Sequence, residues 1–102
     1  MQNIFDSIVS RLSVFDPEQI ILFGSWARGT ADEKSDMDLL VIMPVNGNRR
    51  KMVLEMDRSL KGLGLARDIV ILTRDEFETD REIPGTIARP AWLEGKLLYE
   101  KH

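Results

Sequence analysis

Residues 23–41 read FGSWARGTADEKSDMDLLV, and this stretch decides how the rest of the chain is interpreted. Residues 20–23 form a short, continuous apolar run that ends at Gly24. Residues 37–43 form a second such run, apolar except for Asp38. Short apolar runs bounded by turn residues are typical of strands that are covered on both faces. The small, polar segment between the two runs predicts a turn followed by a short helix or loop.

Outward from this stretch, helical and strand patterns alternate. Apolar residues recur at helical spacing in residues 3–13 and 49–63, and residues 68–72 (DIVIL) predict a third strand. The remaining predictions are a short helix over 74–80, another over 86–93 interrupted by Pro90, and a last strand or packed tail over 96–99. This order predicts an α/β (α+β) fold, in which helices pack against a small mixed β-sheet. The pattern leaves the strand directions open.

Length and composition set the outer limits. The chain has 102 residues, which predicts a single domain over 1–102. It contains no cysteine and one histidine, the last residue, which excludes disulfides and thiolate metal sites and makes zinc hydrolase or Ser-His-Asp chemistry a poor fit. No segment has the length of a membrane span or the pattern of a signal peptide, so we expect a cytoplasmic protein with no membrane partner.

The charge pattern gives no strong signal for nucleic-acid binding. The formal net charge is −3, and residues 49–51 (Arg-Arg-Lys) form the only basic run. We interpret this run as the solvated start of a helix rather than a nucleic-acid patch. A nucleotide ligand remains compatible with the acidic balance, because Mg²⁺ bridges carboxylates and phosphates.

Gly24 and Ser25 stand where a strand ends and a helical segment can begin. Glycine lets the backbone approach a phosphate closely, and the serine hydroxyl adds a donor. Taken alone, Gly-Ser after a strand is more often an ordinary turn.

Three aspartates stand at the starts of predicted strands. Asp36 and Asp38 are separated by one residue, so both side chains project from the same face, where their repulsion favours a bound Mg²⁺ or Mn²⁺. Asp68 opens the third strand, where a carboxylate needs a partner or a metal. Each aspartate alone has a plain alternative: a solvated turn residue, or a strand-end partner of Arg67 or Arg74. Gly24-Ser25 followed at this spacing by Asp36 and Asp38 would arise by chance on the order of once in a thousand chains of this size.

The stretch FGSWARGTADEKSDMDLLV resembles the Gly-Ser…Asp-x-Asp signature of the DNA polymerase β-like nucleotidyltransferase superfamily. It is most similar to the minimal nucleotidyltransferase (MNT) family, whose members commonly pair with HEPN-domain ribonuclease toxins as antitoxins. The motif covers residues 22–41, RDIVIL resembles the strand of the third carboxylate, and the rest agrees in element order and length. The C-terminal LEGKLLYE is also similar to MNT chain endings.

The resemblance implies a nucleotidyltransferase fold and a role for each motif residue. Gly24 and Ser25 would grip the phosphates of ATP, Asp36 and Asp38 would ligate two Mg²⁺ ions, and Asp68 would complete one metal site and help to deprotonate the acceptor hydroxyl. Arg28 could contact the triphosphate or be an ordinary surface arginine. Relatives often carry a basic residue directly after Gly-Ser. In this chain that position is Trp26, which we expect to pack rather than stack on a base.

The resemblance favours transfer of AMP to a hydroxyl on a HEPN toxin, with the chain acting as an antitoxin. One alternative is a non-catalytic antitoxin that binds its partner stoichiometrically through apolar residues such as Trp92, Leu97 and Leu98, which could equally close the core. Another is a small-molecule, aminoglycoside-like nucleotidyltransferase. Such relatives have extra C-terminal structure for the acceptor, so here a partner protein or another copy of the chain would have to supply it.

Overall fold

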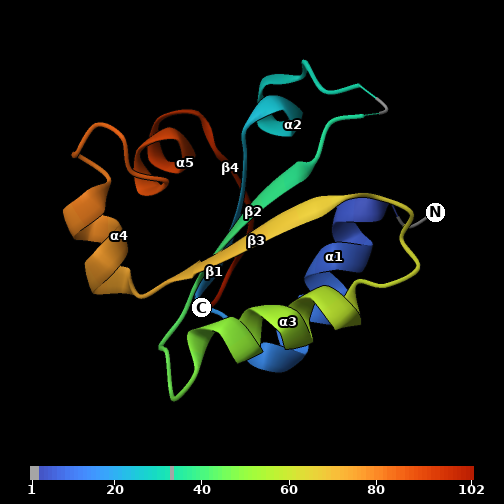
Figure 1. Ribbon diagram of the computed structural model, residues 1–102, viewed down its shortest axis with the longest axis horizontal. Coiled ribbons are helices and arrows are strands. Elements are labelled where there is room, and N and C mark those ends of the chain that lie inside the picture. Colours follow the sequence, from blue (N-terminus) through green and yellow to red (C-terminus); the bar gives the residue numbers. More distant parts are fainter. Residues whose placement is uncertain (1–2, 33) are drawn as a thin grey trace.

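A four-stranded mixed β-sheet with helices on both faces forms the body of the protein (Figure 1). The structure is a computed structural model, and it describes residues 3–32 and 34–102. The strands are β1 (Gln19–Phe23), β2 (Met37–Ile42), β3 (Arg67–Leu72) and β4 (Lys96–Glu100). The helices are α1 (Ile4–Leu12), α2 (Ser25–Arg28), α3 (Arg49–Ser59), α4 (Arg74–Asp80) and α5 (Ala88–Glu94), with a 3₁₀ turn at Ser13–Phe15. The predicted fold class is confirmed.

The strand directions, which the sequence leaves open, follow from the connections. The strand order is β3-β2-β1-β4, and β1 is antiparallel to both of its neighbours. β2 and β3 are parallel and are joined through α3, as a parallel pair requires a crossover. Residues 96–99, predicted as a strand or a tail, belong to β4, whose pairing with β1 shifts register between Ile20 and Ile21.

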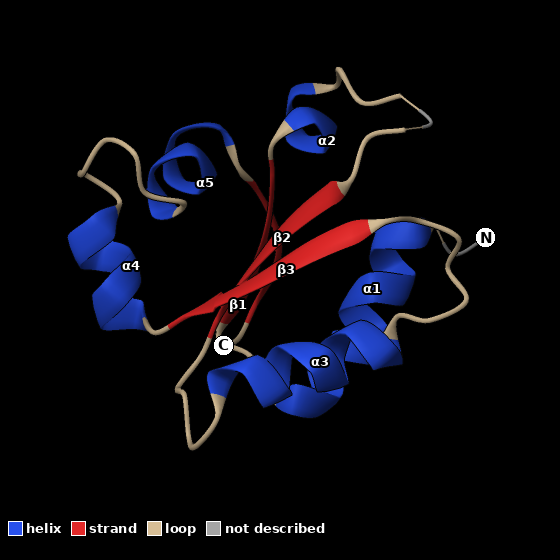
Figure 2. Ribbon diagram, viewed as in Figure 1, coloured by secondary structure: helices blue, strands red, loops and turns tan. Residues whose placement is uncertain are grey.

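The helices divide into two layers, which explains why the central strands are apolar throughout. α1 and α3 cover one face of the sheet, while α4 and α5 cover the other (Figure 2). Along β2, Leu39 and Val41 pack toward the first layer and Leu40 and Ile42 toward the second. All four side chains are fully buried, as expected for strands covered on both faces. Among the described residues, no helix is long and apolar enough to cross a membrane.

Two helix predictions differ from the structure in their bounds. The helix predicted over 49–63 ends at Ser59 and is followed by a turn over residues 60–62; Gly62 and Gly64 have positive φ angles. The helix predicted over 86–93 begins at Ala88, so Pro90 lies in its first turn. A proline in the first turn removes an amide that has no partner within the helix, and it therefore does not interrupt α5.

The two tryptophans have different environments. Trp26 is half-buried: its ring meets Phe5 edge-on at 6.4 Å between centroids, and its Nε1 donates to the Ser35 carbonyl at 3.3 Å. The prediction that Trp26 packs is confirmed. Leu98 also packs against the core, but Trp92 and Leu97 are 42% and 53% exposed, so the reading that these two close the core is wrong. Leu97 belongs to β4, an edge strand of the sheet, whereas Trp92 lies on α5, which buries Ala88 and Ala91 instead.

The start of α4 is fixed by a reciprocal capping box. The Thr73 hydroxyl accepts from the Glu76 amide, and the Glu76 carboxylate accepts from the Thr73 amide at 2.8 Å. The same carboxylate accepts from Arg49 at 3.1 Å, and Arg49 also donates to the Ile71 carbonyl of β3. These hydrogen bonds, first that from the Thr73 backbone and then that from Arg49, lower the pKa of Glu76 below its ordinary value of 4.5. Arg49 therefore ties α3, β3 and α4 together.

Glu76→Gln is expected to destabilise the fold only where Glu76 is ionised. The amide keeps the capping acceptor and loses the charge that pairs with Arg49, which costs no more than about 1 kcal/mol for a partly exposed pair. A lowered carboxyl pKa stabilises the fold above pH 4.5, and this contribution is lost as the pH falls through the folded-state pKa. Urea unfolding should therefore show a larger stability difference between wild type and variant at pH 7 than at pH 3. Glu78→Gln, an exposed change on the same helix, should show no such difference.

Candidate active site

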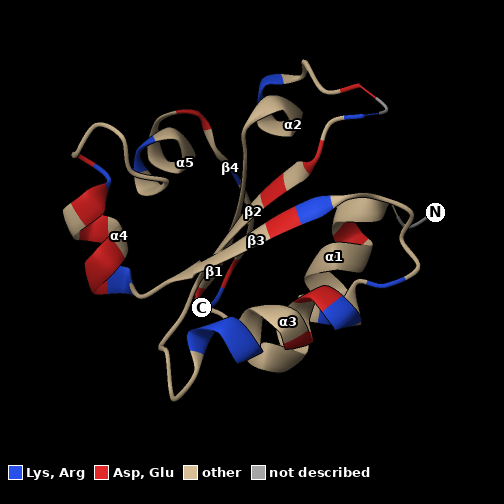
Figure 3. Ribbon diagram, in the orientation of Figure 1, with Lys and Arg blue, Asp and Glu red and all other residues tan. Residues whose placement is uncertain are grey.

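The three predicted carboxylates lie at one end of the sheet, on two neighbouring parallel strands. Asp38 and Asp68 are each the second residue of their strand and are register partners between β2 and β3. Strand alternation places both side chains on the face covered by α4 and α5, where Leu40 and Val70 also lie. Asp36 is exposed one residue before β2, and Figure 3 shows the acidic segments of both strands side by side. Residues thirty positions apart thus form one acidic cluster.

Asp38 carries the electrostatic signature of this cluster. Partial burial raises the pKa of its carboxyl above the ordinary 3.8, and the negative charges of Asp68 and then Asp36 raise it further. The positive charge of Arg28 acts weakly in the opposite direction. The fold therefore disfavours the ionised form of Asp38, which lies near two other negative charges. Such an arrangement is typical of sites that bind a cation.

Gly24 lies directly against the Asp38 carboxylate. The register of β1 and β2 pairs Phe23 with Asp38, so the residue that follows β1 turns over the start of β2. A Cβ atom at Gly24 would collide with Oδ2 of Asp38. The backbone of Gly24 has φ +74° and ψ −154°, a region that essentially only glycine adopts. Both close approach and backbone conformation therefore require glycine here.

Ser25 begins α2, the short helix predicted after the glycine. The Gly24 carbonyl accepts from the amides of Ala27 and Arg28, each at 3.1 Å, and the Ser25 carbonyl accepts from the Thr30 amide at 3.0 Å. These bonds close the turn and leave the half-buried Ser25 side chain at the first helical position, next to the cluster. The Ser25 hydroxyl and nearby amides are therefore placed to meet an anion beside the carboxylates.

Arg28 lies at the other end of α2, between the cluster and α5. Its Nη1 is 3.4 Å from Oε2 of Glu94, and both side chains are about half exposed. Its influence on the Asp38 pKa places it within electrostatic reach of the cluster. Glu94 is a neighbour that sequence reasoning missed, because no pattern links residues 28 and 94 before the fold is known.

The loop that carries Asp36 is held by local hydrogen bonds. The Asp32 amide donates to Oγ of Ser35 at 2.9 Å, and Oδ1 of Asp32 accepts from the Lys34 amide at 2.8 Å. The bond from Trp26 to the Ser35 carbonyl anchors the same segment to α2. Asp36 follows directly, so its position depends on this turn.

The donor set suits a hard divalent cation. Mg²⁺ and Mn²⁺ prefer oxygen ligands such as the carboxylates of aspartate. Neighbouring strands lie about 4.8 Å apart, so the paired residues Asp38 and Asp68 are close to each other. Burial and then the charges of Asp68 and Asp36 raise the pKa of Asp38, and a bound cation would favour its ionised form. In their present positions no three Asp, Glu or His side chains of residues 3–32 and 34–102 converge tightly enough to hold one ion. Side-chain rotation at these positions would be part of binding.

A separate cavity of about 310 Å³ lies between α4, α5 and β4. Arg81 and Trp92 line it, with the guanidinium carbon 5.0 Å from the centre of the indole ring. None of the six predicted site residues lines this cavity, which is therefore distinct from the carboxylate cluster.

The family follows from comparison with known proteins. A profile for the nucleotidyltransferase domain matches residues 2–91, most of the chain, so this protein belongs to the nucleotidyltransferase domain family. The prediction that the protein is a nucleotidyltransferase is thereby confirmed.

Particular relatives add narrower likenesses. "Putative protein adenylyltransferase MJ0141" of Methanocaldococcus jannaschii is 44% identical over 39 residues, which are 35% of this chain and 39% of that protein. The chain thus spans about two fifths of that relative. A toxin–antitoxin structure with AMP-PNP has a TM-score of 0.66 at 22% identity, covering 98% of this chain and 76% of that one. The toxin–antitoxin MntA-HpeT, in mutant form, has a TM-score of 0.65 at 21% identity, covering 99% and 76%. At these identities the structures establish the shared fold.

Proposed function

We propose that this nucleotidyltransferase moves AMP from ATP to a hydroxyl group on a partner toxin, with two Mg²⁺ ions, and thereby acts as an antitoxin. The observation that carries the proposal is the acidic cluster: Asp38 and Asp68 are paired on adjacent strands, Asp36 lies beside them, and partial burial together with these two charges raises the pKa of Asp38. A protein acceptor is supported by the name of the archaeal relative, and a toxin partner by the two toxin–antitoxin neighbours. Within that proposal, a HEPN toxin is the expected partner.

The chain's own residues divide the work. Asp36 and Asp38 would hold the two Mg²⁺ ions, and Asp68 would complete one of the two sites. Bound Mg²⁺ neutralises charge on the phosphates and makes the acceptor hydroxyl easier to deprotonate. The Gly24 backbone and the Ser25 hydroxyl hold the β- and γ-phosphates next to Asp38, since only a residue without a side chain fits against that carboxylate.

The reaction is a substitution at the α-phosphorus. The acceptor oxygen forms the new P–O bond, the bond to the β-phosphate oxygen breaks, and pyrophosphate leaves in line. Asp68 is exposed at the start of β3 and takes the hydroxyl proton, which then passes to solvent. Arg28 contacts the triphosphate, which requires it to exchange Glu94 for phosphate oxygens.

A second candidate function, neutralisation of the partner by stoichiometric binding, is favoured by one observation. Of the seven large apolar side chains that are exposed among the described residues, five lie in the last quarter of the chain. They are Ile83, Ile87, Trp92, Leu93 and Leu97. This surface is also compatible with an enzyme that docks its protein substrate, so only a catalytic variant separates the two functions.

A label-transfer assay tests the proposal. Wild type and Asp38→Ala are each incubated with ATP labelled at the α-phosphate, Mg²⁺, and a lysate of the source cell or a purified partner. We expect one labelled protein band with wild type and none with the variant, because only transfer of the α-phosphate retains the label. If the variant still protects cells from the partner while wild type transfers no label from any NTP with Mg²⁺ or Mn²⁺, the binding function replaces the enzymatic one.

A further inference from the structure

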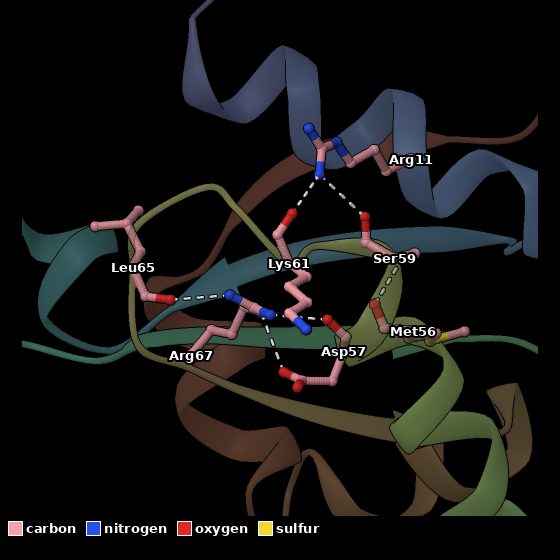
Figure 4. Close-up of polar contacts among 7 residues, drawn as sticks. All are labelled: Arg11, Met56, Asp57, Ser59, Lys61, Leu65 and Arg67. Carbon is pink, nitrogen blue, oxygen red and sulfur yellow. Dashed lines mark hydrogen bonds and ion pairs between the residues drawn. The ribbon is translucent and has the colours of Figure 1, made fainter.

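The C-terminal end of α3 is held by two arginines from different elements (Figure 4). The last carbonyl groups of an α-helix lack the amide donors that a further helical turn would supply, so other donors bind them. From α1, Arg11 Nη1 donates to the carbonyls of Ser59 at 3.2 Å and Lys61 at 2.9 Å. From the start of β3, Arg67 Nη2 donates to the Asp57 carbonyl at 2.7 Å. Two cations therefore stabilise the negative end of the α3 dipole.

Arg67 does more than cap the helix, because its contacts also fix the loop that leads into β3. Its Nη1 donates to the Leu65 carbonyl at 3.0 Å, and its Nε lies 3.1 Å from Oδ1 of Asp57. The Arg67 side chain is only 13% exposed. The loop itself contains Gly62 and Gly64, both with positive φ, and glycine restricts the backbone less than other residues do.

The residue that follows Arg67 is Asp68, the third carboxylate of the cluster. Successive side chains of a strand point to opposite faces, so Arg67 reaches toward α3 while Asp68 points to the side of Asp38. The guanidinium is thus attached to the far side of the same short backbone segment that carries the carboxylate. Ordering that segment orders Asp68.

We propose that Arg67 is a positioning residue for Asp68. It holds the segment that leads into β3 against the end of α3, and this clamp fixes the position of the third carboxylate. The role in catalysis rests on the function proposed above, while the clamp itself is a property of the fold. Arg11 supplies a matched control, since it caps the same helix end with two hydrogen bonds but touches neither the Leu65 carbonyl nor β3.

Arg67→Ala, Arg67→Lys and Arg11→Ala are compared with wild type in the label-transfer assay, well below their melting temperatures. For Arg67→Ala we expect kcat to fall 10–100-fold, the usual loss when a residue that orients a metal ligand is removed, with KM for ATP nearly unchanged. Arg67→Lys should recover part of kcat, because one ammonium keeps the charge but cannot reach all three acceptors. Arg11→Ala should lose stability and keep kcat.

Amide hydrogen exchange of the same proteins provides a readout that does not depend on activity. The clamp predicts faster exchange over residues 67–69 in Arg67→Ala but not in Arg11→Ala. Equal exchange in the two variants, or equal loss of kcat, would overturn the positioning role and leave Arg67 a general stabiliser. If wild type transfers no label, the proposed function fails, and the exchange comparison still decides whether Arg67 orders the start of β3.

Discussion

Asp38→Asn is expected to lower the rate of nucleotidyl transfer by at least about 100-fold and, at neutral pH, to make the fold more stable. The rate falls because a proposed metal ligand is lost, and residues that merely orient metal ligands already contribute 10–100-fold. The stability rises because the ionised carboxyl is unfavourable in the fold, as its raised pKa shows. A carboxyl with a raised folded-state pKa favours the fold at low pH and disfavours it once the pH exceeds that pKa. The neutral amide removes the unfavourable charge.

Thermal unfolding at pH 7, together with the label-transfer rate, tests this prediction. Asp75→Asn is the matched control: it removes the same charge from an exposed position on α4 and should leave the rate unchanged. Near-normal transfer by Asp38→Asn would remove Asp38 from the catalytic machinery. A lower melting temperature for Asp38→Asn would show that its carboxylate is stabilised by the fold, against the reading of the cluster as a site that awaits a cation.

Gly24→Ala is expected to abolish transfer and to destabilise the fold by about 1–3 kcal/mol. The backbone cost arises because φ +74° with ψ −154° lies outside the range of residues with a Cβ. The added methyl group would also displace the Asp38 carboxylate, which its position overlaps. One added methyl group thus disturbs the proposed phosphate-binding turn and the proposed metal ligand together.

Gly29→Ala separates the backbone effect from the collision. Gly29 also has a positive φ of +77°, but a Cβ there meets nothing within 4 Å. We expect it to lose about 1 kcal/mol of stability and to keep most of its activity. Urea unfolding and transfer rates of the two variants show whether the collision with Asp38 costs activity beyond the backbone effect. Equal activity in both would show that the contact between Gly24 and Asp38 has no role in catalysis.

The sequence was sufficient for the features that depend on local pattern. The doubly buried strands follow from apolar runs such as residues 37–43, and the placement of Gly24 follows from its position after such a run. Pairing of Asp38 with Asp68 required the direction of β3, which an apolar run does not encode because it reads the same in either sense. Before the structure was known, only the family resemblance placed Asp68 in the same site as Asp38.

Features that depend on long-range packing could not be predicted. The Arg28–Glu94 pair and the capping of α3 by Arg11 and Arg67 join residues 10 to 66 positions apart through the assembled sheet. Trp92 and Leu97 are as apolar as core residues, but Leu97 lies on the edge strand β4 and α5 buries Ala88 and Ala91 in place of Trp92. Charge and hydrophobicity alone do not distinguish these environments.

Binding of Mn²⁺ tests the central claim, that the three aspartates form one metal–nucleotide site, without any knowledge of the acceptor. Electron paramagnetic resonance counts the Mn²⁺ bound per chain at saturation with an ATP analogue whose α,β-bridge cannot be cleaved. Wild type should bind two ions per chain together with the analogue, and Asp38→Asn and Asp68→Asn should each bind fewer. The same number of ions in all three proteins would contradict the account, because the aspartates would then contribute nothing to metal binding.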